Sequence, residues 1–188
     1  MILVTGGAGF IGSHLVEKLL SEGKQVICLD NFNDFYNPEL KEENIEQARQ
    51  HDNCKLVKGD ILDEQLLQEI FEEHDINKIV HLAALAGVRK SLASPQDYID
   101  TDIKGTVNLL KKANQHNVEQ FVFASSSSVY GESQDVPFQE DQATENQVSP
   151  YACSKKAAEL FCKTYHNLYN LPVIILRFFT VYGPRQRP

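Results

Sequence analysis

Six short apolar runs, most of them separated by segments with a helical pattern, organise this chain. The runs are rich in β-branched residues and occupy positions 2–5, 25–30, 55–60, 78–84, 120–126 and 173–179. Nearly continuous apolar strands are typical of parallel sheets that are buried on both faces, and right-handed crossovers place helices on both sides of such a sheet. The pattern therefore predicts an α/β fold with a doubly wound parallel sheet.

The first apolar run leads directly into a glycine-rich turn, which is followed by an amphipathic pattern over residues 13–23. Gly7, Gly9 and Gly12 fit the Gly-x-Gly-x-x-Gly template, and Gly6 adds the wider Gly-x-x-Gly-x-x-Gly spacing. The early glycines allow a sharp turn and a close approach to a pyrophosphate, while Gly12 lets the next helix lie close to the strand. The N-terminus of that helix favours an anion. The context predicts the dinucleotide site of a Rossmann fold, although a tight structural turn is the alternative.

An acidic residue, Asp30, closes the second apolar run, about one βα unit after the glycines. A carboxylate there can accept hydrogen bonds from the adenosine ribose hydroxyls and repel a 2′-phosphate, which favours NAD over NADP. Turn residues and a charged helical pattern follow, up to residue 51. This segment is long for a simple crossover, and we expect it to lie beside the cofactor or at an interface.

A second chemical motif begins a later helical pattern. Ser149 suits the N-cap and Pro150 the first helical position. Tyr151 and Lys155 are four residues apart and would share one helix face, so the ammonium can favour the ionised phenol as a general base. The serine run 125–128 ends the preceding strand, where a hydroxyl can bind the reacting oxygen. A solvated helix face is the ordinary alternative for such a pair.

Composition excludes several other classes of protein. The chain has 188 residues, of which 42% are hydrophobic and 23% charged, which is enough for one sizeable core. The formal net charge is -8 with scattered lysines and arginines, so no nucleic-acid partner is expected. No basic leader and no bilayer-spanning apolar stretch are present, which predicts a cytoplasmic protein without a membrane partner. The four cysteines and six histidines show no metal-ligand spacing, so no metal and only reduced thiols are expected.

Motifs spread over nearly the whole chain resemble one family. They are TGGAGFIG, the acid at Asp30, GDI at 59–61, HLAA at 81–84, SSSSVYG and Tyr-x-x-x-Lys. In this order they are similar to the extended short-chain dehydrogenases/reductases of the nucleotide-sugar epimerase and dehydratase branch. The resemblance implies NAD as cofactor, Tyr151 as the base, Lys155 on the nicotinamide ribose, and Ser126 on the sugar hydroxyl. The cofactor contacts it implies besides Tyr151 and Lys155 are Gly6, Gly9, Phe10, Ile11, Gly12, Asp30, Asn31, Asp60, Ile61, Leu82, Ala83 and Ala84.

Within this branch, the residues after the catalytic hydroxyl distinguish the reactions. Dehydratases usually carry Asp-Glu there, to protonate the departing hydroxide and remove a proton, whereas this chain has Ser127 and Ser128. The resemblance therefore implies a 4-epimerase: Tyr151 takes the hydroxyl proton while NAD takes a hydride. The resulting 4-keto sugar turns over and receives the hydride on its opposite face. The family often has Asn near Thr101 and Asp102, which leaves cofactor contacts there open.

Three segments, DNFNDFYNP, LAGVRKS and RFFTVYGPRQRP, are more similar to UDP-glucuronate 4-epimerases than to the UDP-glucose enzymes. A hydroxyl and a bidentate guanidinium suit a carboxylate. The predicted substrate-binding residues are Ser127, Ser128, Thr180, Arg187 and Arg89. Arg185 competes with Arg187, Arg89 serves either a phosphate or the fold, and a solvated tail is the alternative for the terminal arginines. UDP-glucose 4-epimerase, a nucleotide-sugar decarboxylase and a non-catalytic NAD-sensing or scaffold module remain alternative functions.

The polar, proline-bounded end of the chain resembles a domain boundary. We expect residues 1–180 to form an NAD-binding Rossmann domain with the catalytic residues, and residues 181–188 to begin the connection to a C-terminal substrate lobe that is missing here. Relatives close their pocket with that lobe, so the chain alone should show little turnover. They also often dimerise through two helices, which here fall near 94–116 and 149–170, so the full-length protein is expected to be a homodimer.

Overall fold

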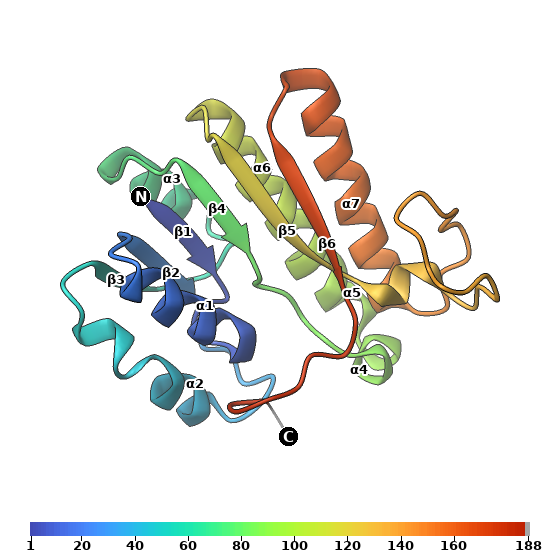
Figure 1. Cartoon of the computed structure of the whole chain (residues 1–188), viewed down its shortest axis with the longest axis horizontal. Helices are drawn as coiled ribbons and strands as arrows, with labels where there is room; N and C mark the ends of the chain where they lie inside the picture. Colours follow the sequence, from blue (N-terminus) through green and yellow to red (C-terminus); the bar gives the residue numbers. More distant parts are fainter. Residues whose placement is uncertain (187–188) are drawn as a thin grey trace.

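The computed structural model describes residues 1–186 and contains a six-stranded, fully parallel sheet (Figure 1). Its strand order is β3-β2-β1-β4-β5-β6, which is the doubly wound Rossmann order and confirms the predicted fold class. The order reverses between β1 and β4, where ligands of such sheets bind. The strands are β1 (Ile2–Thr5), β2 (Val26–Asp30), β3 (Cys54–Lys58), β4 (Lys78–His81), β5 (Gln120–Ser126) and β6 (Val173–Phe178).

Helices cover both faces of the sheet. The α-helices are α1 (Phe10–Ser21), α2 (Pro38–Ile45), α3 (Glu64–Glu73), α4 (Val88–Ala93), α5 (Pro95–Tyr98), α6 (Gly105–Gln115) and α7 (Pro150–Tyr169). Two short 3₁₀ turns, η1 (Ala48–Gln50) and η3 (Ser127–Tyr130), follow α2 and β5. A π-helical stretch, η2 (Ile99–Lys104), joins α5 to α6. In Figure 1, α1 and α2 lie on one side of the sheet, and α3, α6 and α7 lie on the other.

Two separate hydrophobic clusters explain why the strands read as continuous apolar runs. In β1, Leu3 belongs to the cluster formed with α3, α6 and α7, while the adjacent Val4 belongs to the cluster formed with α1 and α2. Both side chains are fully buried. Successive side chains of a strand point to opposite faces, so a strand in the middle of a sheet covered on both faces, such as β2, buries every position, whereas the edge strands β3 and β6 keep exposed ones.

The ends of the helices follow local signals in the sequence. Ser149 accepts a hydrogen bond from the Ala152 N–H at 3.1 Å, and Pro150 occupies the first position of α7, as predicted. Asn37 caps α2 in the same way. Helix α1 begins at Phe10, earlier than its amphipathic pattern suggested, because the glycine turn itself leads directly into the helix. None of the helices within residues 1–186 combines the length and the apolar character needed to cross a bilayer.

Candidate functional site

The turn from β1 into α1 has no room for a side chain at Gly6 or Gly12. Gly6 has a φ of 69°, and a Cβ atom added there would lie 2.7 Å from the backbone nitrogen of Ala83. A Cβ atom on Gly12 would lie 2.1 Å from the carbonyl oxygen of Gly6. The N-cap of α1 is Gly9, which offers no side-chain cap, and the first turn has no acidic residue. Free backbone N–H groups and the positive end of the helix dipole therefore face the space above the loop, as an anionic diphosphate requires.

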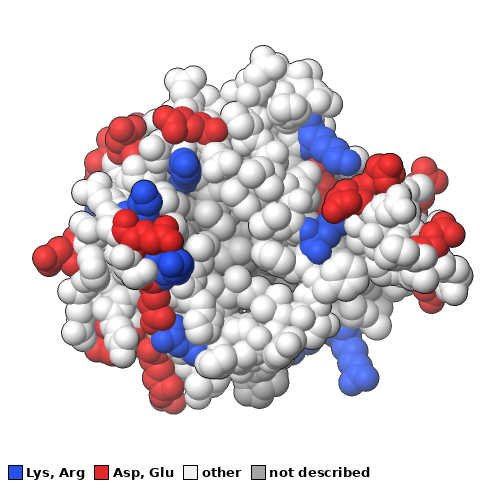
Figure 2. Space-filling model, viewed as in Figure 1, with Lys and Arg blue, Asp and Glu red and all other residues white. Residues whose placement is uncertain are grey.

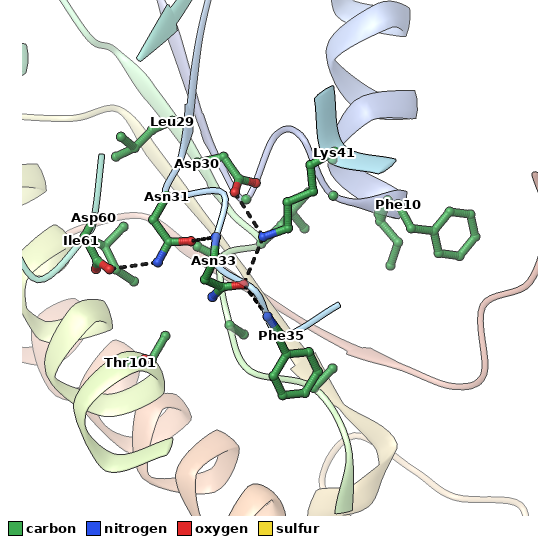
Figure 3. A pocket seen from close by; sticks show the side chains of 18 of the residues that line it. Phe10, Leu29, Asp30, Asn31, Asn33, Phe35, Lys41, Asp60, Ile61 and Thr101 are labelled. Atoms are coloured by element: carbon green, nitrogen blue, oxygen red, sulfur yellow. Dashed lines mark hydrogen bonds and ion pairs between the residues drawn. The ribbon is translucent and has the colours of Figure 1, made fainter. Parts of the chain in front are cut away.

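A pocket of about 240 Å³ lies above this loop, at the carboxyl ends of β1, β2 and β4 (Figure 3). It extends over the adjoining loops at the sheet's switch point. Twelve residues predicted to contact the cofactor line it: Gly6, Gly9, Phe10, Ile11, Gly12, Asp30, Asn31, Asp60, Ile61, Leu82, Ala83 and Ala84. The structure thus brings together the glycine loop, the acid after β2 and the loops after β3 and β4 in one concave surface, which the linear motifs could only suggest.

Asp30 lines the end of this pocket that the sequence predicts for adenosine (the adenosine end), and the ammonium of a second residue lies beside its carboxylate. Its carboxylate accepts hydrogen bonds from the N–H groups of Ala8 at 3.2 Å and Phe32 at 2.9 Å. The ammonium of Lys41, from α2, lies 3.3 Å from Oδ1 of Asp30 and also donates to Asn33 at 3.0 Å (Figure 3). The sequence showed α2 only as a charged helical stretch, so Lys41 was not among the predicted site residues.

A larger cleft of about 550 Å³ adjoins the first pocket and shares Phe10, Ile11 and Leu82 with it. The predicted catalytic and substrate-binding residues that line it are Ser126, Ser127, Tyr151, Lys155 and Thr180. They come from the end of β5, the first turns of α7 and the segment after β6. The two hollows are therefore continuous, and the second brings a phenol, an ammonium and three hydroxyls beside the first.

The two residues of the Tyr-x-x-x-Lys pair are held differently. Lys155 is buried, and its ammonium donates to the carbonyl oxygen of Ala124 at 3.2 Å and lies 5.2 Å from the centre of the Phe123 ring. The Tyr151 ring packs edge-on against Tyr98, with 6.1 Å between the ring centroids. Burial with few oxygen contacts keeps the Lys155 charge close to the cleft, where it can stabilise an anion.

The serine run contains hydroxyls with different partners. Ser125 donates to the carboxylate of Glu159 at 2.6 Å, so its hydroxyl hydrogen is engaged inside the protein. Ser126 accepts from the N–H of Ser128 at 3.1 Å, which leaves its own hydroxyl hydrogen available toward the cleft. This difference favours Ser126 over Ser125 as a donor toward the cleft; Ser127 lines the same cleft.

A buried network connects the loop after β4 with the catalytic helix. The carboxylate of Asp102, in η2, accepts from the Leu85 N–H and from the Ser154 hydroxyl, each at 2.9 Å. Burial raises the pKa of Asp102 above its ordinary value, although the charge of Lys155 and these two hydrogen bonds oppose the shift. Asp102 therefore ties the wall of the first pocket to α7, a role that the sequence did not indicate.

His81 forms a second part of this network. Its Nδ1 lies 2.7 Å from the Thr5 hydroxyl, and its Nε2 lies 3.0 Å from the Thr106 hydroxyl. Thr106 donates its hydrogen to the Asp102 carbonyl, so His81 must donate through Nε2 and accept from Thr5. Burial, and then the charge of Lys155, lower the pKa of His81 to about 3. His81 is thus a neutral structural residue, as we expected for the histidines.

Some predicted substrate-binding residues lie away from the cleft lining. Ser128 is not among the lining residues; its hydroxyl is buried and has no hydrogen-bond partner in the described part of the chain. Arg89 is exposed on α4. Arg185 pairs with Glu17 of α1 at 2.7 Å, and Arg187 lies outside the described residues. Residues 1–186 contain no group of three or more side chains that could hold a metal ion.

Comparison with known proteins places this geometry in a family. A family model described as GDP-mannose 4,6 dehydratase matches residues 3–188. A UDP-glucuronate 4-epimerase of Thermodesulfobacterium geofontis is 47% identical over 99% of this chain and 57% of its own length. Protein CapI of Staphylococcus aureus is 44% identical over the whole chain and 56% of its own length. The chain thus spans somewhat more than half the length of these curated relatives.

Solved structures agree with these sequence matches. The UDP-glucuronic acid 4-epimerase of Bacillus cereus, in complex with UDP-glucuronic acid and NAD, has a TM-score of 0.90 and 40% identity, covering 100% of this chain and 59% of its own. The UDP-glucose 4-epimerase of Thermotoga maritima, with UDP-glucose, has a TM-score of 0.89 and 37% identity, covering 98% of this chain and 57% of its own. Together with the predicted short-chain dehydrogenase/reductase motifs, these matches show that the chain belongs to the GDP-mannose 4,6-dehydratase family.

Proposed function

We propose that this protein is an NAD-dependent nucleotide-sugar 4-epimerase that acts on UDP-glucuronate. The observation that carries the proposal is the continuity of the two hollows, which places a side-chain-free anion cradle next to Ser126, Tyr151 and Lys155. Relatives that bind NAD and UDP-sugars share this fold over the whole chain. A UDP-glucose 4-epimerase is the second candidate, because one such enzyme matches nearly as well.

The proposed roles follow from the chemistry of the side chains. Bound NAD supplies a hydride acceptor and donor, so that the sugar carbon can be oxidised and reduced again. The phenol oxygen of Tyr151 removes the proton of the sugar 4-hydroxyl and returns it after the hydride has come back on the opposite face. The Lys155 ammonium stabilises the phenolate, and the Ser126 hydroxyl donates to the sugar oxygen. The remaining predicted cofactor contacts bind the dinucleotide and orient it.

Among the described residues, the lack of an available carboxyl pair at the cleft favours epimerisation over dehydration. Ser127 and Ser128 occupy the positions where a dehydratase needs its carboxyl pair. Glu159 is held by Arg177 and Ser125, and Asp102 by Leu85 and Ser154, so neither carboxylate is available to a departing hydroxide. A reaction that needs only one phenolic base fits the site better.

The choice of UDP-glucuronate depends on recognition of a carboxylate. We propose that Thr180 and Arg187 bind it, with Ser127 opposite; the predicted Ser128 is left out because its hydroxyl is buried and does not line the cleft. Arg185 is the weaker candidate, because its guanidinium is engaged by Glu17 and the Ser13 hydroxyl. Arg89, exposed on α4, is kept as a residue for a substrate phosphate or for the fold.

We further propose that residues 1–180 form the NAD-binding domain with the catalytic residues, and that residues 181–188 lead toward a substrate-binding lobe. Apolar side chains at this junction support the division: Phe179 is 60% exposed and Tyr182 is 84% exposed. Large exposed apolar surface commonly marks a site of further contact. The chain matches only 57% and 56% of the length of two curated relatives, which is compatible with a further lobe.

We also propose that the full-length protein is a homodimer and lies in the cytoplasm. Apolar residues are exposed on η2, which lies within the predicted dimer segment 94–116, and on α7, which matches the segment 149–170: Ile99, Leu160, Phe161 and Leu168. Figure 2 shows lysines and arginines interspersed with acidic residues on the face that it presents, which gives no support to a nucleic-acid surface. The four cysteines are free, which agrees with a reducing compartment. Sedimentation of the purified protein tests the dimer.

Replacing Tyr151 by Phe tests the proposed function. In the complete protein, we expect conversion of UDP-glucuronate to fall by about 10²–10⁴-fold, while the affinity for NAD, measured by isothermal titration calorimetry, stays within twofold. Tyr169→Phe, on the exposed end of α7, is the control and should leave both quantities unchanged. Unaltered turnover in Tyr151→Phe would remove the phenol from the mechanism, and preferential turnover of UDP-glucose would favour the second candidate.

A further inference from the structure

The adenosine end of the first pocket contains a buried ion pair. The side chains of Lys41 and Asp30 are only 7% and 4% exposed, and their nearest charged atoms are 3.3 Å apart. Both residues line the pocket. Figure 3 shows the Lys41 side chain reaching from α2 toward Asp30 and Asn33. A dinucleotide bound here would therefore meet a cation beside the acid that was expected to select its ribose.

Contacts of α2 fix the position of this ammonium. Asn37 caps the helix, and the Asn44 side chain donates to the carbonyl oxygen of Ala8 at 3.1 Å, so α2 is attached to the glycine loop itself. Ile45 is fully buried in the hydrophobic cluster beneath. Lys41 shares the buried side of α2 with these two residues. Its charge is therefore a permanent part of the pocket wall rather than a mobile surface charge.

The hydrogen bonds already made by Asp30 and Lys41 limit those that the two side chains can offer to a ligand. A carboxylate has about four acceptor sites, and Asp30 already accepts hydrogen bonds from Ala8, Phe32 and Lys41. About one acceptor site is therefore left for the two ribose hydroxyls. An ammonium has three donors, and Lys41 uses two of them on Asp30 and Asn33. Its third donor is left for the Tyr36 ring, whose centre lies 5.2 Å from the ammonium, or for a ligand oxygen.

The charges lead to the same conclusion. An acid after the second strand of this fold excludes NADP because it repels the 2′-phosphate. Here the positive charge of Lys41 lies 3.3 Å from the negative charge of Asp30, so the pair repels a nearby phosphate less than Asp30 alone would. Given the dinucleotide site of the proposed function, we propose that Lys41 is a specificity-determining residue that weakens the rejection of a 2′-phosphate by Asp30.

The experiment compares ligands that differ only by that phosphate. The chain has no tryptophan, so dissociation constants of NAD and NADP, and of 5′-AMP and adenosine 2′,5′-bisphosphate, are measured by isothermal titration calorimetry. In Lys41→Gln we expect the ratio of the NADP to the NAD dissociation constant to rise about tenfold. In Asp30→Asn, which leaves the cation unopposed, the ratio should fall by a similar factor.

Two further variants control for charge and for folding. Lys58→Gln removes an equal charge on β3, where the ammonium is exposed and pairs with Glu42, and should leave the ratio unchanged. Lys41→Arg keeps the charge, so its ratio of NADP to NAD dissociation constants should stay within threefold of that of the unaltered protein. If Lys41→Gln does not fold, Lys41→Arg and Asp30→Asn are compared instead.

The outcomes separate the two proposals. If the unaltered protein binds neither dinucleotide, the proposed function fails. If it binds NAD, and neither Lys41→Gln nor Asp30→Asn changes the ratio by more than twofold, the role of Lys41 is wrong while the proposed function stands. If Lys58→Gln raises the ratio as much as Lys41→Gln, net charge rather than the buried pair is responsible, and the inference is equally overturned.

Discussion

The adenosine end of the site and its proposed sugar end, the cleft lined by Ser126 and Tyr151, differ in how completely residues 1–186 form them. At the adenosine end, Asp30 and Lys41 are buried and satisfy one another. At the sugar end, Phe179 and Tyr182 are exposed and the buried Ser128 hydroxyl has no described partner. The proposed cofactor pocket is therefore preorganised, whereas the proposed sugar site leaves apolar surface and a buried hydroxyl without contacts among residues 1–186. Cofactor binding and turnover should accordingly respond to different changes.

The largest effect is expected beneath the sugar end, where Arg177 binds Glu159 through two hydrogen bonds of 2.9 Å. Burial raises the pKa of Glu159, but the bonds from Arg177 and Ser125 outweigh it and hold the pKa below its ordinary value. Arg177→Met leaves this buried carboxylate without its cation, and we expect the free energy of unfolding in urea to fall by about 3–5 kcal/mol. The double variant Arg177→Met, Glu159→Leu should lose less; an equal loss would show that packing, not charge, dominates.

A somewhat smaller loss is expected at the adenosine end from Gly12→Ala. The added Cβ would meet the Gly6 carbonyl oxygen at 2.1 Å, so the loop must shift, at a cost of about 3 kcal/mol and with loss of NAD binding. Gly23→Ala is the matched control. Gly23 has a φ of 72° but open space around it, so only backbone strain of about 1–2 kcal/mol applies and NAD affinity is retained. Equal losses of affinity in both variants would contradict the crowded loop.

Between the two ends, His81 makes stability depend on pH. Its pKa is lowered to about 3 in the folded protein, so below its ordinary value near 6.5 the unfolded chain binds a proton that the folded chain does not. Stability should therefore fall on acidification, by about 1.4 kcal/mol per pH unit from this group, until the pH approaches 3. Urea titrations of the unaltered protein and of His81→Gln test this. The variant should lose that part of the slope between pH 6.5 and 5, and an identical slope would rule out the buried neutral imidazole.

The smallest effects are expected from the helix caps, one at each end of the site. Asn37→Ala and Ser149→Ala each remove a side-chain acceptor from a helix N-terminus and should cost about 1 kcal/mol. Hydrogen exchange should then distinguish the two regions. Asn37→Ala should speed exchange within α2, which carries Lys41, and leave α7 protected. Faster exchange in both helices would show that the two ends are not independent.

Much of this architecture was predictable from the sequence because it follows local rules. The apolar runs predicted the six strands, the glycines predicted the tight turn between β1 and α1, and Ser149 with Pro150 predicted the start of α7. Resemblance to a family supplied the choice of pocket residues, which the structure gathers around the switch point of the sheet.

The remaining features depend on contacts between distant segments. Lys41 belongs to a strongly charged stretch and looked like a solvated residue until tertiary packing placed it on Asp30. Asp102 and His81 gained their partners from four separate elements, which no spacing in the sequence reveals. The predicted adjacency of Ser128 to the substrate likewise could not be judged without knowing that its hydroxyl is buried behind the cleft lining.

The 20 residues of helix α7 include both the proposed catalytic side chains and several exposed apolar residues. Tyr151, Lys155 and Glu159 recur every four residues on its inward side, while Leu160 and Leu168 reach solvent. Inserting a single residue between Tyr151 and Lys155 would rotate everything beyond it by about 100° and turn Lys155 and Glu159 away from Ala124 and Ser125. Substitutions can therefore accumulate on the exposed side of α7, whereas an insertion or deletion between Tyr151 and Glu159 would separate these side chains.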